Sequence, residues 1–117
     1  MDETLSKEYK LKGKKLIGNL FDEGNSIKAF PLILAYKSSE EINIEFKVGF
    51  SVSKRNFNRA VDRNRIKRLM REYFRKNKYL FIKEKQSFVY MFIYVGKEMP
   101  VFSEIGKAME KLALKLK

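Results

Sequence analysis

The chain has 117 residues, of which 44% are hydrophobic and 34% are charged, and its formal net charge is +12. This length suits one modest hydrophobic core and is too short for two, so we expect a single domain over residues 1–117. Cys, His and Trp are absent, which excludes disulfides, thiolate chemistry, histidine general bases and most zinc or haem sites.

The sequence contains no evident targeting or membrane segment. The first ten residues, MDETLSKEYK, include acidic side chains and no apolar run, unlike a signal or transit peptide. The longest nearly unbroken apolar stretch, residues 88–95, is far shorter than a membrane span. We therefore expect a soluble, cytoplasmic protein.

The first third of the chain predicts a short helix followed by a strand. The helix covers residues 14–23, because Leu16, Ile17, Leu20 and Phe21 recur at helical spacing and Gly24 follows as a cap. Residues 31–37, PLILAYK, predict a strand that ends at a polar cluster over residues 38–41.

Residues 42–52 give the clearest strand prediction, because apolar and polar residues alternate strictly there. One predicted face carries the apolar set Ile42, Ile44, Phe46, Val48, Phe50 and Val52. The other face is unusually small towards its end, at Gly49, Ser51 and Ser53. Such residues either allow another backbone to approach closely or belong to a solvated sheet face.

A long basic helix is predicted over residues 58–76. Its apolar stripe consists of Ile66, Leu69, Met70, Tyr73 and Phe74. The opposite side gathers Arg59, Asn64, Lys67, Arg68, Arg71 and Arg75. Arg63 and Arg65 flank the apolar stripe, where their stems can lie against it while their guanidinium groups reach solvent.

The chain then predicts a strand and a last helix. Residues 88–95, FVYMFIYV, are apolar at both parities, as expected for a strand buried on both faces. A strand, a helix and a buried strand in succession suggest a crossover unit with parallel strands. In the final helix we expect Ser103 as the N-cap and an inner stripe of Ile105, Ala108, Met109, Leu112 and Leu116.

The positive charge is concentrated in one segment. Between Lys54 and Lys78 there are eleven Lys or Arg residues and only Asp62 and Glu72 as acids, which gives +9 of the total charge. Such a segment favours a polyanionic partner, and Arg engages phosphate oxygens bidentately. Because the helix is charged along its whole length, it indicates phosphate contact more than base reading, and structured RNA more than specific DNA.

Two segments resemble a known family. VGFSVSK at 48–54 and AVDRNRIKRLMREYFR at 60–75 closely resemble the signature of the bacterial ribonuclease P protein subunit, an Arg-Asn-Arg helix after an alternating strand. LKGKKLIGNLFDEGNS at 11–26 is similar to that family's first helix and glycine stop. The resemblance implies an α+β fold, a small α/β sandwich of order αβββαβα, like the second domain of a ribosomal small-subunit protein. Its mixed sheet would contain a left-handed βαβ crossover, whereas handedness rules alone favour a right-handed one.

The resemblance also implies a function. The family binds a large catalytic RNA, and together they remove the 5′ leader from precursor tRNA by endonucleolytic cleavage. Mg²⁺ held mainly by the RNA performs the hydrolysis, so the chain would be the non-catalytic subunit of an endoribonuclease, with no catalytic or metal-binding residue. Its partners would be ribonuclease P RNA and precursor tRNA, with no membrane and no obligate protein partner.

By motif match, the resemblance assigns two sets of site residues. The residues expected to contact the catalytic RNA are Arg59, Arg63, Asn64, Arg65, Lys67, Arg68 and Arg71. The leader would lie in a cleft between the first helix and the open sheet face, and the residues expected to line it are Ile17, Phe21, Ser51, Ser53, Lys54, Arg55 and Lys97. At Ile17 and Phe21, plain core packing explains an apolar side chain equally well.

Two positions differ from the family pattern, and two other functions stay open. Many relatives carry an aromatic residue at the place of Ile17 and a basic residue at Gly96, for which Lys97 would substitute. The main alternative function is a ribosomal or ribosome-associated RNA-binding protein without a role in cleavage. An enzyme that uses Glu72, Lys67 or Tyr73 is a poorer alternative, because these residues lie along one helix with no evident pocket.

Overall fold

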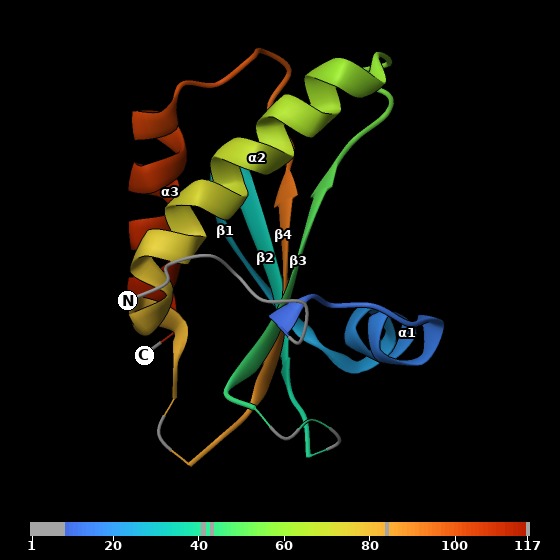
Figure 1. Cartoon of the computed structure of the whole chain (residues 1–117), viewed down its shortest axis with the longest axis vertical. Helices are drawn as coiled ribbons and strands as arrows, with labels where there is room; N and C mark the ends of the chain where they lie inside the picture. Colours follow the sequence, from blue (N-terminus) through green and yellow to red (C-terminus); the bar gives the residue numbers. More distant parts are fainter. Residues whose placement is uncertain (1–8, 41, 43, 84, 117) are drawn as a thin grey trace.

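The computed structural model describes residues 9–40, 42, 44–83 and 85–116, which form three helices, a short 3-10 helix and four strands (Figure 1). In chain order the elements are α1 (Lys14–Glu23), β1 (Asn25–Ala29), β2 (Leu32–Ser38), β3 (Phe46–Val52), α2 (Ala60–Asn77), the 3-10 helix η2 (Lys78–Phe81), β4 (Phe88–Tyr94) and α3 (Phe102–Lys115). The expected order αβββαβα is confirmed.

The strands form one mixed sheet of order β1-β2-β4-β3. β1 pairs with β2 and β2 with β4 in antiparallel fashion, whereas β3 and β4 are parallel and joined through α2. In Figure 1 both parallel strands point upwards with α2 in front of the sheet, and β4 lies to the left of β3. The crossover is therefore left-handed, as the family resemblance predicts and against the usual preference.

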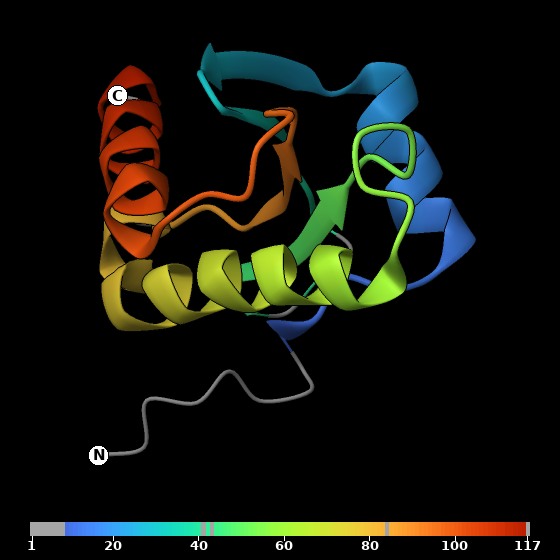
Figure 2. The same ribbon diagram turned by 90° about the horizontal axis from the view of Figure 1, so that it is seen from above.

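One face of the sheet is covered by two helices, and it holds the larger core. α2 and α3 pack on this face, while α1 lies on the other side (Figures 1 and 2). Phe74 of α2 sits at the centre, with ring centroids 5.2 Å from Phe46 and 5.6 Å from Phe92. The Tyr90 hydroxyl donates a 2.6 Å hydrogen bond to the Phe81 carbonyl oxygen, and burial raises the pKa of this phenol. The side chain thus stays neutral and satisfied in the core.

The opposite face is covered only in part. A smaller apolar cluster joins Leu20 of α1 to the sheet residues Ala35, Val89 and Met91. Further along the same face, Ile33 and Ile93 remain half-buried. The prediction that residues 88–95 are buried on both faces is therefore wrong at Phe88, Ile93 and Val95, which are half-buried. At Ile93 and Val95 the reason is that α1 is too short to cover the whole sheet.

Three predicted boundaries also differ from the structure. β3 begins at Phe46, because Ile42 packs with the α1-side cluster and not in line with the strand's apolar face. α2 begins at Ala60. Ser103 is not the N-cap of α3: the helix begins at Phe102, and a Glu104 carboxylate oxygen accepts a 3.2 Å hydrogen bond from the Val101 N–H at the cap.

The residue pattern did not predict β1 or the short η2. The five residues of β1 alternate poorly in hydrophobicity, and β1 gains its strand geometry by pairing along its whole length with residues 32–36 of β2. Pairing between neighbours along the chain is a tertiary effect that a periodicity argument does not detect. Only the family resemblance supplied this third strand.

Candidate nucleic-acid interface

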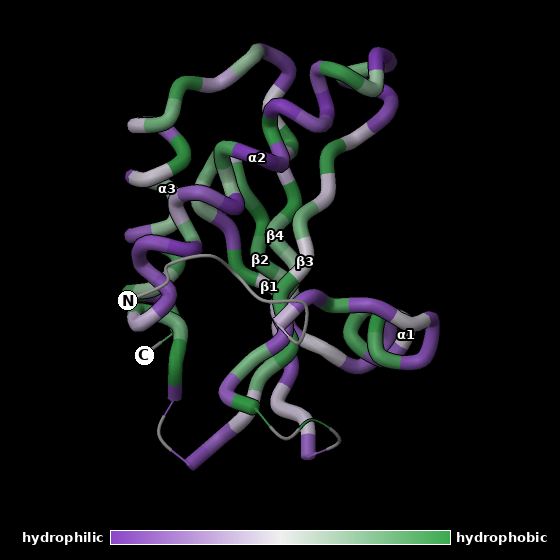
Figure 3. Tube along the Cα trace, in the orientation of Figure 1, coloured by the Kyte–Doolittle hydropathy of each residue, from purple (hydrophilic) through white to green (hydrophobic). Residues whose placement is uncertain are grey.

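The basic face of α2 points away from the two core clusters. Ile66, Met70 and Phe74 bury the inner side of the helix completely. Of the residues expected to contact RNA, the exposed ones are Arg59, Asn64, Arg65, Arg68 and Arg71, and the half-buried ones are Arg63 and Lys67. In Figure 3 hydrophilic residues recur along α2, whereas β2 and β4 are mainly hydrophobic.

Several of these cations have partners inside the chain. An Arg63 Nη1 donates a 2.9 Å hydrogen bond to the Phe57 carbonyl oxygen in the turn before α2. The guanidinium carbon of Arg71 lies 6.0 Å from the centroid of the Phe50 ring. The Nε of Arg59 lies 4.0 Å from a carboxylate oxygen of Asp62. The hydrogen bond from Arg75 holds the pKa of Glu72 below its usual value, and the positive charges of the neighbouring cations add to this effect. The Glu72 carboxylate is therefore ionised and already bound to Arg75.

Arg65, Lys67 and Arg68 are different. Within the described part of the chain, none of these three side chains makes a hydrogen bond or an ion pair. Unpartnered guanidinium and ammonium groups along one helix keep their hydrogen-bond donors free for an external anion, and phosphate oxygens match the planar fork of Arg. This part of α2 is the surface best suited to a polyanion.

The open sheet face forms a second surface, beginning next to α1. The strand register places Ser51, Ile93 and Ile33 in one row across β3, β4 and β2. A hollow of about 250 Å³ at this level is lined by Phe21, Ile33, Ala35 and Ile93, among others. Phe21 is 55% exposed, so it is not a core residue and offers its ring to this hollow.

A more polar hollow follows at the end of β3. It has a volume of about 690 Å³ and is lined by Ser53, Arg55, Asn56, Val95 and Lys97. The Asn56 side chain donates hydrogen bonds of 3.5 and 3.4 Å to the carbonyl oxygens of Val95 and Gly96, which ties the turn after β3 to the end of β4. Val95 follows Ile93 at the same parity along the chain, so the two hollows lie on the same side of the sheet and are together called the groove below. Arg55 and Lys97 are the two cations at its end near β3.

The expected leader-cleft residues therefore separate into two groups. Ser53, Arg55 and Lys97 line one hollow and Phe21 lines the other, with Ser51 between them in register with Ile93. Ile17 is half-buried on α1, Lys54 is exposed in the turn, and neither lines these hollows. Sequence reasoning missed Ile33, Ile93, Val95 and Asn56; the outward parity of β4 is the signal that would have indicated two of them.

Gly49 has an intramolecular reason to be small. A Cβ at this position would lie 3.0 Å from the Met91 methyl and 3.5 Å from Leu11 Cβ. The Leu11 N–H donates a 2.9 Å hydrogen bond to the Val48 carbonyl oxygen, so the chain's own N-terminal segment runs along the free edge of β3. The backbone that approaches closely here belongs to the protein itself.

The chain matches the family model described as Ribonuclease P over residues 5–117. A ribonuclease P protein component from Porphyromonas gingivalis is 35% identical over 117 residues, covering 96% of this chain and 85% of the relative. Another from Macrococcus caseolyticus is 36% identical over 106 residues, covering 91% and 88%. The chain belongs to the ribonuclease P protein family.

Solved structures of this family have the same fold. The Staphylococcus aureus RNase P protein superposes with a TM-score of 0.76 at 26% identity, covering 92% of this chain and 94% of that one. The Thermotoga maritima protein gives a TM-score of 0.75 at 21% identity, covering 92% and 97%. Proteins of this family are components of an endoribonuclease and associate with ribonuclease P RNA. Among the described residues, no helix is long and apolar enough to cross a membrane.

Gly96, just after β4, lies against a side chain of its own strand. The Tyr94 hydroxyl donates a 2.6 Å hydrogen bond to the Glu98 carbonyl oxygen. A Cβ at position 96 would lie 2.5 Å from this hydroxyl oxygen, which is closer than a real Cβ contact. Any larger residue at 96 therefore has to displace the Tyr94 ring and its hydrogen bond to Glu98, and Lys97 is the adjacent cation that lines the hollow with Arg55.

Proposed function

We propose that this chain binds the catalytic RNA of ribonuclease P and the 5′ leader of precursor tRNA, and that it assists RNA-catalysed removal of the leader. The observation that carries the proposal is the cationic surface of α2 at Arg65, Lys67 and Arg68, whose side chains have no partner among the described residues, together with a groove of different chemistry. A rigid helix with free cations suits the fixed phosphates of a folded RNA. A groove with an apolar floor and cationic rim suits a single strand, whose bases stack on apolar side chains.

The two surfaces are adjacent along the chain. β3 ends at Val52 and α2 begins at Ala60. The turn between them contains Lys54 and Arg55, so it links the groove to the basic helix. Asn56 fixes one side of this turn through hydrogen bonds to the carbonyl oxygens of the two residues after β4, and Arg63 fixes the other side through its hydrogen bond to the Phe57 carbonyl oxygen. This arrangement supports a complex in which the protein binds the catalytic RNA through α2 and holds the leader in the groove beside it.

In this proposal the chain contributes charge and alignment while the RNA performs the chemistry. Among residues 9–40, 42, 44–83 and 85–116, no group of three or more His, Cys, Asp or Glu could hold a metal ion. We place the catalytic Mg²⁺ mainly with the RNA. The protein's excess positive charge would replace part of the magnesium that screens repulsion between the catalytic RNA and its substrate.

The test is cleavage of a 5′-labelled precursor tRNA across a magnesium series, with RNA alone, protein alone and both together. We expect correct leader removal by the complex at magnesium concentrations where the RNA alone is nearly inactive, and a smaller advantage at high magnesium. Cleavage by RNA-free protein would contradict the proposal, as would the absence of any protein-dependent gain at low magnesium. Arg68→Glu should remove much of the gain, whereas Lys111→Glu, an equal charge change on the exposed side of α3, should keep it.

A ribosomal role would give a different result in a second experiment. Sequencing the RNA that co-purifies with the protein should identify one ribonuclease P RNA. Ribosomal RNA in its place would support the alternative function.

A further inference from the structure

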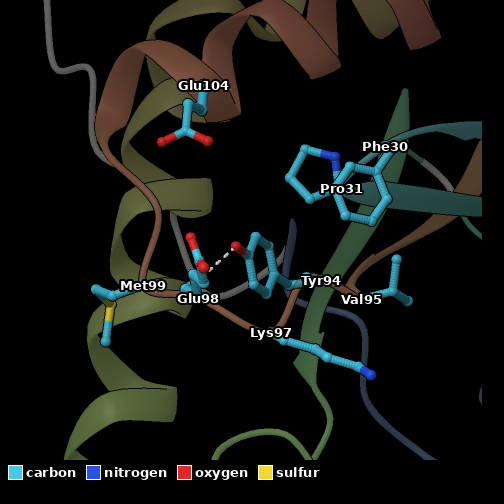
Figure 4. A pocket seen from close by; sticks show the side chains of 9 residues that line it. Phe30, Pro31, Tyr94, Val95, Lys97, Glu98, Met99 and Glu104 are labelled. Carbon is cyan, nitrogen blue, oxygen red and sulfur yellow. Dashed lines mark hydrogen bonds between the residues drawn. The ribbon is translucent and has the colours of Figure 1, made fainter.

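A third hollow lies where the β1–β2 turn meets the loop between β4 and α3 (Figure 4). It has a volume of about 350 Å³, and its walls include Phe30, Pro31, Tyr94, Lys97, Glu98 and Glu104. None of the surfaces described above includes Phe30. The Phe30 ring is 80% exposed, the most exposed large apolar side chain among the described residues.

This hollow continues the groove of the open sheet face. Val95 and Lys97 line both this hollow and the one formed with Ser53 and Arg55. The Val95 N–H donates a 2.9 Å hydrogen bond to the Pro31 carbonyl oxygen, so the end of β4 and the β1–β2 turn are held together at the junction. The hollow that contains Phe30 is therefore the next one beyond the hollow lined by Ser53.

The chemistry of the hollow is divided between its two sides. In Figure 4 the Lys97 side chain extends towards the Val95 side, whereas the carboxylates of Glu98 and Glu104 lie on the other side of the Tyr94 ring. The carboxylates repel a phosphate from the inner side, and Lys97 with Arg55 attracts one at the outer side. The Tyr94 hydroxyl is already bonded to the Glu98 carbonyl oxygen, so this residue presents its ring to the hollow.

We propose that this hollow is an additional nucleotide-binding subsite for single-stranded RNA. Phe30 stacks on a base, the base enters between Pro31 and Tyr94, and the adjoining phosphate pairs with Lys97. The proposal rests on leader binding by the groove, and it extends the leader contact beyond the groove to nucleotides further from the cleavage site. Stacking on an exposed aromatic ring is sequence-tolerant, because every base has a π-face.

The test measures the affinity of the complex with ribonuclease P RNA for a series of precursor tRNAs whose leaders lengthen one nucleotide at a time. For the wild type we expect affinity to rise with leader length and then level off. Phe30→Ala should level off at a shorter leader and bind long-leader substrates about tenfold more weakly, from the usual energy of base stacking. Phe30→Tyr should restore the wild-type curve, and Phe30→Leu should not.

Tyr79→Ala is the matched control, because Tyr79 is an aromatic residue with 67% exposure in η2, outside this hollow. Its curve should match the wild type. The subsite is overturned if the Phe30→Ala curve also matches the wild type, or if the loss is equal for leaderless tRNA. A wild-type protein whose affinity does not depend on the leader at all would instead overturn the proposed function.

Discussion

Arg63 and Arg65 should respond differently to replacement by alanine, although both belong to the Arg-Asn-Arg sequence. Arg63 is half-buried and donates to the Phe57 carbonyl oxygen at 2.9 Å, whereas Arg65 is exposed without a partner among the described residues. A hydrogen bond from a charged donor contributes about 1.5–3 kcal/mol when protected from water. Because solvent reaches Arg63, we expect Arg63→Ala to lower the free energy of unfolding by about 1 kcal/mol, or roughly 4 °C in Tm.

Arg65→Ala should leave the free energy of unfolding within about 0.5 kcal/mol of the wild type. Its effect should appear in RNA binding, because each lost phosphate contact reduces the slope of log affinity against log salt by about 0.7–0.9. Between about 50 mM and about 200 mM salt, the variant should therefore lose about threefold less affinity than the wild type. The assays are urea unfolding and filter binding to ribonuclease P RNA across a salt series.

Two results would contradict these expectations for Arg63 and Arg65. Equal losses of stability in the two variants would mean that the bond to Phe57 contributes nothing. An unchanged salt slope in Arg65→Ala would mean that this side chain contacts no phosphate.

Three further predictions concern the groove, the Gly96 turn and the core edge. Phe21→Leu should keep most of the stability, because the ring is 55% exposed, and should weaken binding of precursor tRNA more than that of mature tRNA. A Tm loss with unchanged leader discrimination would mean that the ring contributes to packing and does not contact the leader. Gly96→Ala should lower the free energy of unfolding by about 1 kcal/mol or more, because the added Cβ displaces the Tyr94 hydroxyl. Gly18→Ala, with nothing within 4 Å of its Cβ, should instead stabilise α1 by about 0.5–1 kcal/mol. Thermal melts of both variants test this pair of predictions. Burial and the hydrogen bond to Glu110 raise the pKa of Tyr73 to about 12 from 10.0. The stability linked to this proton is therefore complete below pH 10 and is lost as the pH rises through 12. Tyr73→Phe should reduce the loss of stability at alkaline pH, measured by urea unfolding, and an unchanged pH profile would contradict this prediction.

The parts of the fold with strong hydrophobic periodicity could be predicted from the sequence. The inner stripe of α2, the parallel pairing of β3 with β4 and the stripe of α3 all follow from apolar spacing and element order. β1 could not be predicted in this way, because its five residues become a strand by pairing with β2. The left-handed crossover also lies beyond local rules, which favour the opposite hand, and was supplied only by the family resemblance.

The candidate site was predictable in composition more than in contacts. The excess of Arg and Lys identified the α2 surface, but spacing could not show that Arg63 donates to Phe57 while Arg65 remains free. Apolar residues at both parities of β4 indicated burial on both faces, whereas Ile93 lies half-exposed on the floor of a groove. The length of α1 decides this difference, because a helix of ten residues covers only part of the sheet.

The two faces of the sheet differ in how much of their surface the helices cover, so the residues of the large core and those of the groove lie on opposite sides. The large core lies wholly on the side of α2 and α3, with Phe46, Phe74 and Phe92 at its centre. The groove lies on the thinly covered side, where side chains such as Ile33 and Ile93 are only half-buried. Substitutions on the groove floor therefore act on few packing contacts and open no large cavity. If the groove binds the leader as proposed, substitutions there can change the preference among RNA strands while the free energy of unfolding stays nearly constant.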